Sequence, residues 1–157
     1  MSTATFDPMH CENSLIARLD RLRTTAGRFP LSLIELGMRL AVGATFFRSG
    51  MNKLMSFDTA ITLFRDEYRL PLLPPEIAAY MGTTIELSAP VLLVLGLFAR
   101  FGAAALLTMT LVIQFLVYPE NWPEHLMWAS ILAYVLSRGA GKLSIERLIA
   151  LNLFGRK

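Results

Sequence analysis

The chain has 157 residues, of which 54% are hydrophobic and 17% are charged, and its mean hydropathy is +0.50. Because soluble globular domains carry about a quarter charged residues, this composition predicts a membrane protein of one domain. A single cysteine, Cys11, excludes an intramolecular disulfide and a CxxC redox pair, and the formal charge of +3 includes no dense basic run that would bind nucleic acid.

Residues 1–28 are charged and lack an apolar core next to a small-residue cleavage site, so we expect a retained segment and not a signal peptide. Within it, LIARLDRLR (15–23) places three leucines at helical spacing opposite Arg18 and Arg21. This pattern predicts an amphipathic helix on the cytoplasmic membrane surface. A short solvated helix is the alternative interpretation.

Four apolar segments follow, and they predict an all-α fold: an integral membrane four-helix bundle over residues 29–138. The expected spans are 29–49, 77–98, 101–119 and 125–137, of which the last is short for a span of about 20 residues. Residues 55–76, which end in prolines, are expected to cap the bundle. The cytoplasmic segment 139–157 contains a second amphipathic helix, for which Ser144 is the expected N-cap.

The distribution of lysine and arginine predicts the orientation of the bundle. One side would carry Arg18, Arg21, Arg23, Arg28, Arg100, Arg138, Lys142, Arg147, Arg156 and Lys157. The other side would carry Lys53, Arg65 and Arg69. Because cytoplasmic loops are enriched in positive charge, both termini are expected in the cytoplasm.

The first span carries unexpected charge. Arg39 lies about 15 Å from its inner end, and Glu86 lies about 13 Å from the outer end of the second span. The sequence therefore predicts a mid-membrane Arg39–Glu86 pair, in which Glu35, one turn before Arg39, shares the guanidinium. The pair could be structural and fix the helix register, or it could be a functional site; the sequence leaves both open.

Arg48 and Lys53 lie near the outer interface, where their side chains can reach the lipid headgroups. The alternative is that they line an outward-facing polar cavity with Glu86. The other candidate residues of that cavity are Gln114, Trp122, His125 and Trp128. Such a set offers hydrogen-bond donors, a proton-exchanging imidazole and aromatic walls, which suit a quinone head group. Tryptophans that only anchor the helices at the interface are the simpler explanation.

Metal and phosphate chemistry find little support in the sequence. Met9, His10 and Cys11 are soft metal ligands, but three neighbouring residues do not make a complete site, and we name no metal ligand. The only histidines are His10 and His125, so no transmembrane pair could hold a bis-histidine haem. No glycine-rich phosphate loop is present.

Three motifs of the chain form a set with a fixed order: the Arg39, Gly43, Phe47, Gly50, Lys53 series, Glu86 followed by LLVLGLFARFGAAALL, and NWPEHLMWASILAYVLSRGAGKLSIERLI. Taken together, they resemble the DoxX family of small four-helix bacterial membrane proteins. The resemblance covers residues 31–149 and departs from the pattern at Ala140, where a proline is expected. It implies a bacterial inner-membrane protein, with some relatives acting in electron transfer from sulfur compounds to quinone and others beside stress-response proteins.

The function expected from the residues and the resemblance is the membrane component of a redox or stress-response assembly, in contact with an oxidoreductase or stress-response partner and with quinone as the candidate cofactor. Two alternatives stay open. One is a transporter or channel-like bundle for a small solute or a metal, gated by Arg39 and Glu86. The other is a membrane scaffold that recruits a soluble partner through its amphipathic ends.

Overall fold

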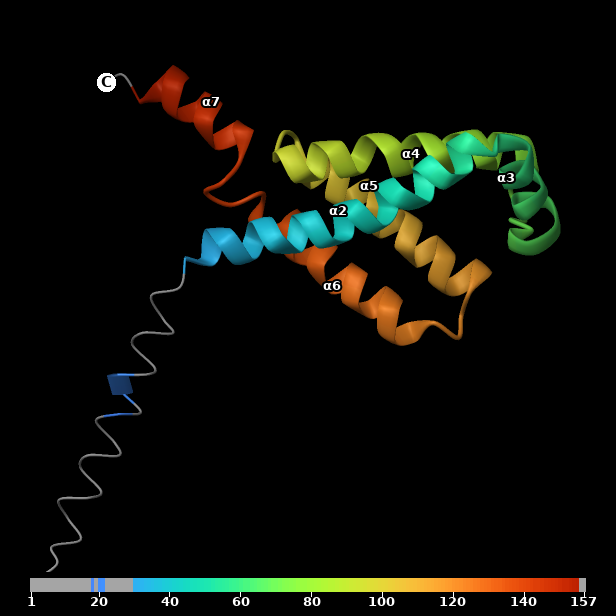
Figure 1. Cartoon of the computed structure of the whole chain (residues 1–157), viewed down its shortest axis with the longest axis horizontal. Helices are drawn as coiled ribbons and strands as arrows, with labels where there is room; N and C mark the ends of the chain where they lie inside the picture. The colour runs from blue at the N-terminus through green and yellow to red at the C-terminus, as the bar shows by residue number, and fades with distance from the viewer. Residues whose placement is uncertain (1–17, 19, 22–29, 156–157) are drawn as a thin grey trace, which may run out of the picture. The chain divides into compact units, whose positions relative to one another are not determined.

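The computed structural model describes residues 18, 20–21 and 30–155, and every element in this part of the chain is helical (Figure 1). The all-α prediction is therefore confirmed. The expected amphipathic helix over residues 15–23 lies almost wholly outside the described residues. Residues 1–31 form a unit separate from residues 32–157, and the account below concerns the second unit.

The described helices follow the predicted apolar segments closely. They are α2 (Leu31–Met55), α3 (Phe57–Leu63), η1 (Phe64–Tyr68), α4 (Pro75–Leu95), α5 (Ala99–Val112), η2 (Ile113–Val117), α6 (Trp122–Arg138) and α7 (Ile145–Phe154). The largest difference is in α2, which continues six residues beyond the expected end at Ser49. Lys53 therefore lies inside a helix and not in a loop.

One hydrophobic core joins α2, α4, α5 and α6. Its buried members include Phe46 from α2, Leu93 from α4, Leu106 from α5 and Leu132 from α6. A smaller cluster around Phe64 packs η1 and α3 against α4. The segment expected to cap the bundle is thus helical, and Figure 1 shows it folded across one end of α2 and α4.

The helices α2 and α4 are antiparallel and approach each other closely at two glycines. A Cβ atom on Gly50 would lie 2.9 Å from Cβ of Glu86, and one on Gly43 would lie 2.7 Å from Cγ2 of Val94. Small residues at such positions allow helix backbones to pack closely, as is common in membrane proteins. The contacts place Gly43 level with Pro90 and Val94, and Gly50 level with Glu86.

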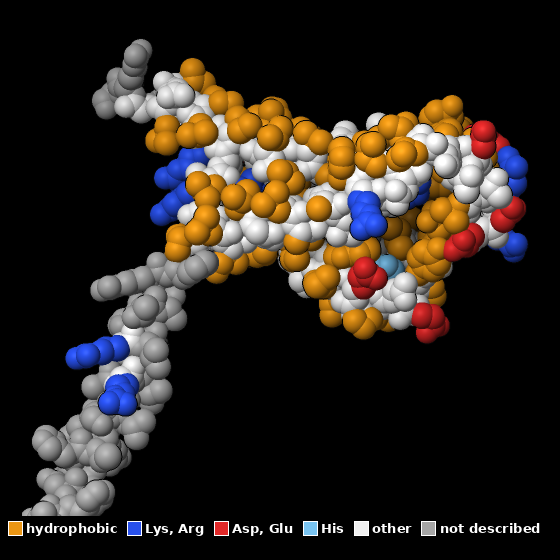
Figure 2. Space-filling model, viewed as in Figure 1, with side chains coloured by type: hydrophobic (Ala, Val, Ile, Leu, Met, Phe, Trp, Pro, Cys, Tyr) orange, Lys and Arg blue, Asp and Glu red, His pale blue; other side chains and the backbone are white. Residues whose placement is uncertain are grey.

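The long faces of the helices carry many exposed apolar side chains, among them Leu40, Phe47, Phe101 and Phe115 (Figure 2). Contiguous apolar surface of this extent is typical of contact with lipid. Two helical segments are long and apolar enough to cross a bilayer by themselves: Pro75–Leu95 and Ala99–Val117. The four-span bundle stays a prediction, because α2 carries charge and α6 has only 17 residues.

Two short π-helical turns interrupt the regular geometry. The first is η1, which ends at Tyr68 before Arg69 turns into the left-handed region with φ of 43°. The second is η2, which follows α5 directly. Such turns occur often beside functional sites, and residues from both of them line one cavity of the described chain.

Candidate functional site

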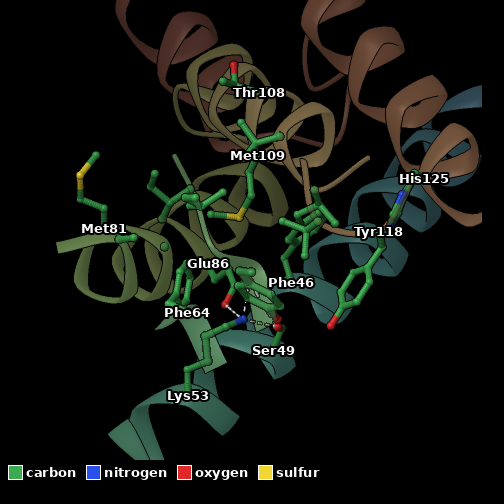
Figure 3. Close-up of a pocket in the computed structure, with 18 of the residues that line it drawn as sticks. Phe46, Ser49, Lys53, Phe64, Met81, Glu86, Thr108, Met109, Tyr118 and His125 are labelled. Atoms are coloured by element: carbon green, nitrogen blue, oxygen red, sulfur yellow. Dashed lines mark hydrogen bonds and ion pairs between the residues drawn. The ribbon is translucent and has the colours of Figure 1, made fainter. Parts of the chain in front are cut away.

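A cavity of about 390 Å³ lies between the helices near the end of α2 and the start of α6 (Figure 3). Most of its wall is apolar and comes from α2, α4, α5 and the two π-helical turns. These side chains include Phe46, Phe64, Met81, Ile85 and Met109. Its polar lining includes Ser49, Lys53, Glu86 and His125. The cavity therefore offers an apolar volume with a charged group in its wall.

The charged group is an ion pair between α2 and α4. The ammonium of Lys53 donates to both carboxylate oxygens of Glu86, at 2.8 and 2.7 Å, and to the hydroxyl of Ser49 at 2.8 Å. Ser49 in turn donates to Glu86 at 3.2 Å. The side chains of Lys53 and Glu86 are only 10% and 6% exposed, so each compensates the desolvation of the other.

The close approach at Gly50 explains this pair. Because Gly50 contacts the backbone of Glu86, its neighbour Ser49 reaches the carboxylate directly. Lys53 lies one helical turn after Ser49 on the same face, so its long side chain bends back to the same carboxylate. The sequence predicted both charged residues but did not identify Ser49.

His125 lies in the first turn of α6 and is 4% exposed. Its Nδ1 is 2.6 Å from Oε1 of Gln114, which is itself buried in η2. Gln114 also donates from Nε2 to the carbonyl of Pro119 at 2.8 Å. These contacts hold the imidazole in one orientation at the cavity wall.

An aromatic series connects His125 to α2. The ring centroids of His125 and Trp128 are 5.3 Å apart, and those of Trp128 and Phe46 are 5.2 Å apart in an edge-to-face arrangement. Aromatic pairs of this geometry stabilise a fold beyond their buried area. All three side chains line the cavity, so α6 and α2 are joined through its wall.

Tyr118 closes the wall between η2 and η1. Its hydroxyl donates to the carboxylate of Glu67, and its ring meets Tyr68 edge to face at 5.8 Å. Burial, and then the hydrogen bond to Glu67, raise the pKa of Tyr118 above the ordinary tyrosine value. The phenol therefore stays a neutral donor at physiological pH.

The predicted Arg39–Glu86 pair is wrong. Arg39 is fully buried, but its guanidinium donates to the carbonyls of Leu93 and Val94, at 3.3 and 3.2 Å, and to that of Leu143. These carbonyls include the last ones of α4, where an arginine is favoured by the helix dipole. The observed register places Arg39 beside Gly96, about ten residues or 15 Å along α4 from Glu86.

Glu35 also has a different partner from the one expected. Its carboxylate accepts a hydrogen bond from the hydroxyl of Tyr134 at 3.0 Å and lies against Gly141, where a side chain would clash with it. No salt bridge joins Glu35 to Arg39 among the described residues. Both residues therefore hold together the end of the bundle that is remote from the cavity.

The candidate cavity residues divide into two groups. Four of them line the cavity together: Lys53, Glu86, His125 and Trp128. Gln114 is not among the lining residues, but it hydrogen-bonds to the imidazole of His125. Arg48 and Trp122 do not line it: Arg48 is exposed, and Trp122 is 53% exposed beside Phe115. Among the described residues no group of three or more histidine, cysteine, aspartate and glutamate side chains could hold a metal ion.

A family model described as DoxX matches residues 34–119. An uncharacterised protein of Haemophilus influenzae is 26% identical over 122 residues, which cover 71% of this chain and 80% of that protein. No solved structure matches the chain significantly.

We predict that Lys53 and Glu86 are energetically coupled. Glu86→Gln should lower the free energy of unfolding by about 3–5 kcal/mol, because it leaves a buried ammonium without its counter-ion. Lys53→Met in the same chain should recover at least about 1 kcal/mol of that loss. The measurement is a double-mutant cycle of unfolding in detergent.

The matched control is the cycle of Arg39→Gln with Glu86→Gln, which should be additive within about 0.5 kcal/mol because the two residues share no partner. A coupled Arg39–Glu86 cycle together with an additive Lys53–Glu86 cycle would contradict the observed pairing.

Proposed function

The chain belongs to the DoxX family of membrane proteins, and from its cavity we propose that it binds a quinone-class head group beside Lys53 and Glu86. In this proposal it is the membrane component of a redox or stress-response assembly, with an oxidoreductase or stress-response protein as its partner. The observation that supports the proposal is the buried ion pair in the wall of an otherwise apolar cavity.

The size and lining of the cavity suit such a ligand. Binding sites for small molecules usually measure about 300–1,000 Å³ and combine apolar walls with a few placed polar groups. Here the rings of Phe46, Phe64 and Trp128 offer apolar surface for a flat ring and its tail. The polar groups of Ser49, Glu86 and His125 lie in the same wall and offer hydrogen-bonding positions for the oxygen substituents of a quinone-class ring.

We further propose that the chain is a multi-pass protein of the bacterial inner membrane with both termini in the cytoplasm. Figure 2 shows basic side chains gathered where α2 begins, and acidic ones, with some basic ones among them, at the opposite end. The described basic residues near the first end are Arg100, Arg138, Lys142 and Arg147. This asymmetry supports a cytoplasmic position for that end, with the cavity near the outer surface.

Reporter fusions test the orientation. A reporter that is active only in the cytoplasm should function when it is fused after Lys157 and fail when it is inserted in residues 118–121. Activity at the inserted site and not at the C-terminal site would contradict the proposed topology.

The transporter alternative has less support. Its gate would need Arg39 and Glu86 to act together, but Arg39 of α2 donates to carbonyls at the C-terminal end of α4, whereas Glu86 in the middle of α4 pairs with Lys53. The described residues also offer no cluster of metal ligands that would serve a metal pathway. A head-group site remains the better explanation of the cavity.

Tryptophan fluorescence tests the proposed function directly, because one tryptophan lines the cavity and the other lies outside it. In the Trp122→Phe variant, decylbenzoquinone should quench the emission of Trp128 with a saturable dependence on concentration. In the Trp128→Phe variant the remaining Trp122 should show only the weak, linear quenching caused by quinone dissolved in the detergent. Equal, unsaturable quenching of both variants would show that the cavity does not bind a quinone.

A further inference from the structure

We infer that the cavity holds its ligand by accepting hydrogen bonds, and that it therefore binds the hydroxyl-bearing hydroquinone in preference to the quinone. The inference rests on the proposed function and names the form of the ligand. It follows from the polar groups around the cavity. Some of them already have hydrogen-bond partners in the protein, and the others are free to bond to a ligand.

The first step concerns the proton on His125. The carbonyl of Pro119 can only accept, so the amide of Gln114 must turn Nε2 towards Pro119, at 2.8 Å. Its Oε1 is then the atom that lies 2.6 Å from Nδ1 of His125. An amide oxygen can only accept, so Nδ1 carries the proton. In the neutral imidazole Nε2 is consequently a bare acceptor.

No described residue donates to Nε2 of His125, and the imidazole lines the cavity. The histidine is also 4% exposed, so bulk water has little access to it. A ligand in the cavity is thus the natural partner of Nε2, and that partner must be a hydrogen-bond donor.

The second step concerns the ion pair. An ammonium has three protons, and those of Lys53 are directed to Ser49 and to both oxygens of Glu86. The proton of Ser49 is directed to Glu86 as well. No donor of this group is left for a ligand. The carboxylate has about four acceptor positions, of which three are occupied, so Glu86 can accept one more hydrogen bond.

The other donors of the wall do not favour the quinone. Thr45 and Thr108 donate to carbonyls of their own helices, and Tyr118 donates to Glu67. The hydroxyl of Tyr68 bonds to Tyr118, and the exposed side-chain amide of Asn121 and the indole N–H of Trp128 have no hydrogen-bond partner among the described residues. A hydroxyl oxygen can accept from these donors as well as a quinone oxygen can. They therefore do not favour the quinone over the hydroquinone.

The hydroquinone and the quinone differ in the hydrogen bonds that they can donate. A hydroquinone has two hydroxyl protons, which suit Nε2 of His125 and the carboxylate of Glu86. A quinone has only acceptor oxygens and would leave both groups desolvated without a donor. Sites that present buried polar groups to a hydroxyl discriminate strongly against analogues that lack it.

The test uses three probes that share a ring and a decyl tail: decylhydroquinone, its dimethyl ether and decylbenzoquinone. Binding to the full chain in detergent is measured by calorimetry in anaerobic buffer at about pH 8. We expect the Kd of decylhydroquinone to be about 10- to 100-fold lower than that of either other probe. The dimethyl ether has the reduced ring but no hydroxyl protons. It therefore separates the effect of the hydroxyl protons from the effect of redox state.

Two variants test the basis of the preference. Gln114→Met removes the acceptor that fixes the proton on Nδ1, so decylhydroquinone should still bind but its advantage should fall severalfold. Arg48→Gln, which lies outside the cavity, should keep the full preference. Thermal unfolding in detergent establishes that both variants are folded before they are compared.

The outcomes distinguish this inference from the proposed function. If all three probes bind equally, or if decylbenzoquinone binds most tightly, the inference is overturned while the cavity remains a quinone-class site. If no probe binds the folded chain, the proposed function and the inference both fail. An unchanged preference in Gln114→Met would overturn the assignment of the proton on His125.

Discussion

The close packing of α2 against α4 is the constraint on which the remaining structure depends. Gly43 and Gly50 are seven residues apart on one face of α2, and both lie against backbone or Cβ atoms of α4. A glycine at each contact lets the helices approach and leaves only one register in which they fit. In that register Ser49 and Lys53 bond to the carboxylate of Glu86, while Arg39 donates hydrogen bonds to carbonyls at the end of α4.

The same register explains why the first long helix tolerates its charges. The two terminal nitrogens of Arg39 donate to carbonyl groups that end α4 and precede α7, so Arg39 holds one end of the bundle together, although its Nε has no hydrogen-bond partner among the described residues. Towards the other end of α2, Lys53 forms an ion pair with the carboxylate of Glu86 beside the cavity. An isolated charge in either place would cost several kcal/mol. Of these two basic residues of α2, Arg39 thus has a structural role, and Lys53 belongs to the candidate site.

Much of this could be predicted from the sequence. Apolar length gave the positions of the helices, and the cost of buried charge identified Lys53, Glu86 and His125 as members of one cavity. The partner of Glu86 could not be predicted, because the depth of Arg39 is counted from the inner end of a span that is expected to stop at Ser49, whereas α2 continues to Met55. The glycine spacing in α2 was a usable signal for the register, since it marks the face that packs against a neighbour.

Arg48 and Trp122 were placed in the cavity by their depth alone, and depth does not tell which face of a helix a residue occupies.

Disulfide cross-linking tests the α2–α4 register most directly. In a chain with Cys11→Ser and with Val94→Ala, which removes the methyl group that a Cβ at residue 43 would meet, the pair Gly43→Cys and Pro90→Cys should oxidise readily, because their Cβ atoms lie 3.9 Å apart and a disulfide needs about 3.5–4.5 Å. The pair Gly43→Cys and Gly82→Cys belongs to the register in which Arg39 would face Glu86, and it should keep both thiols free. Alkylation of free thiols followed by mass spectrometry counts them in each chain. The observed register leads us to expect a cross-link in the first pair and none in the second, and a cross-link in the second pair alone would show that the helices pack in the other register.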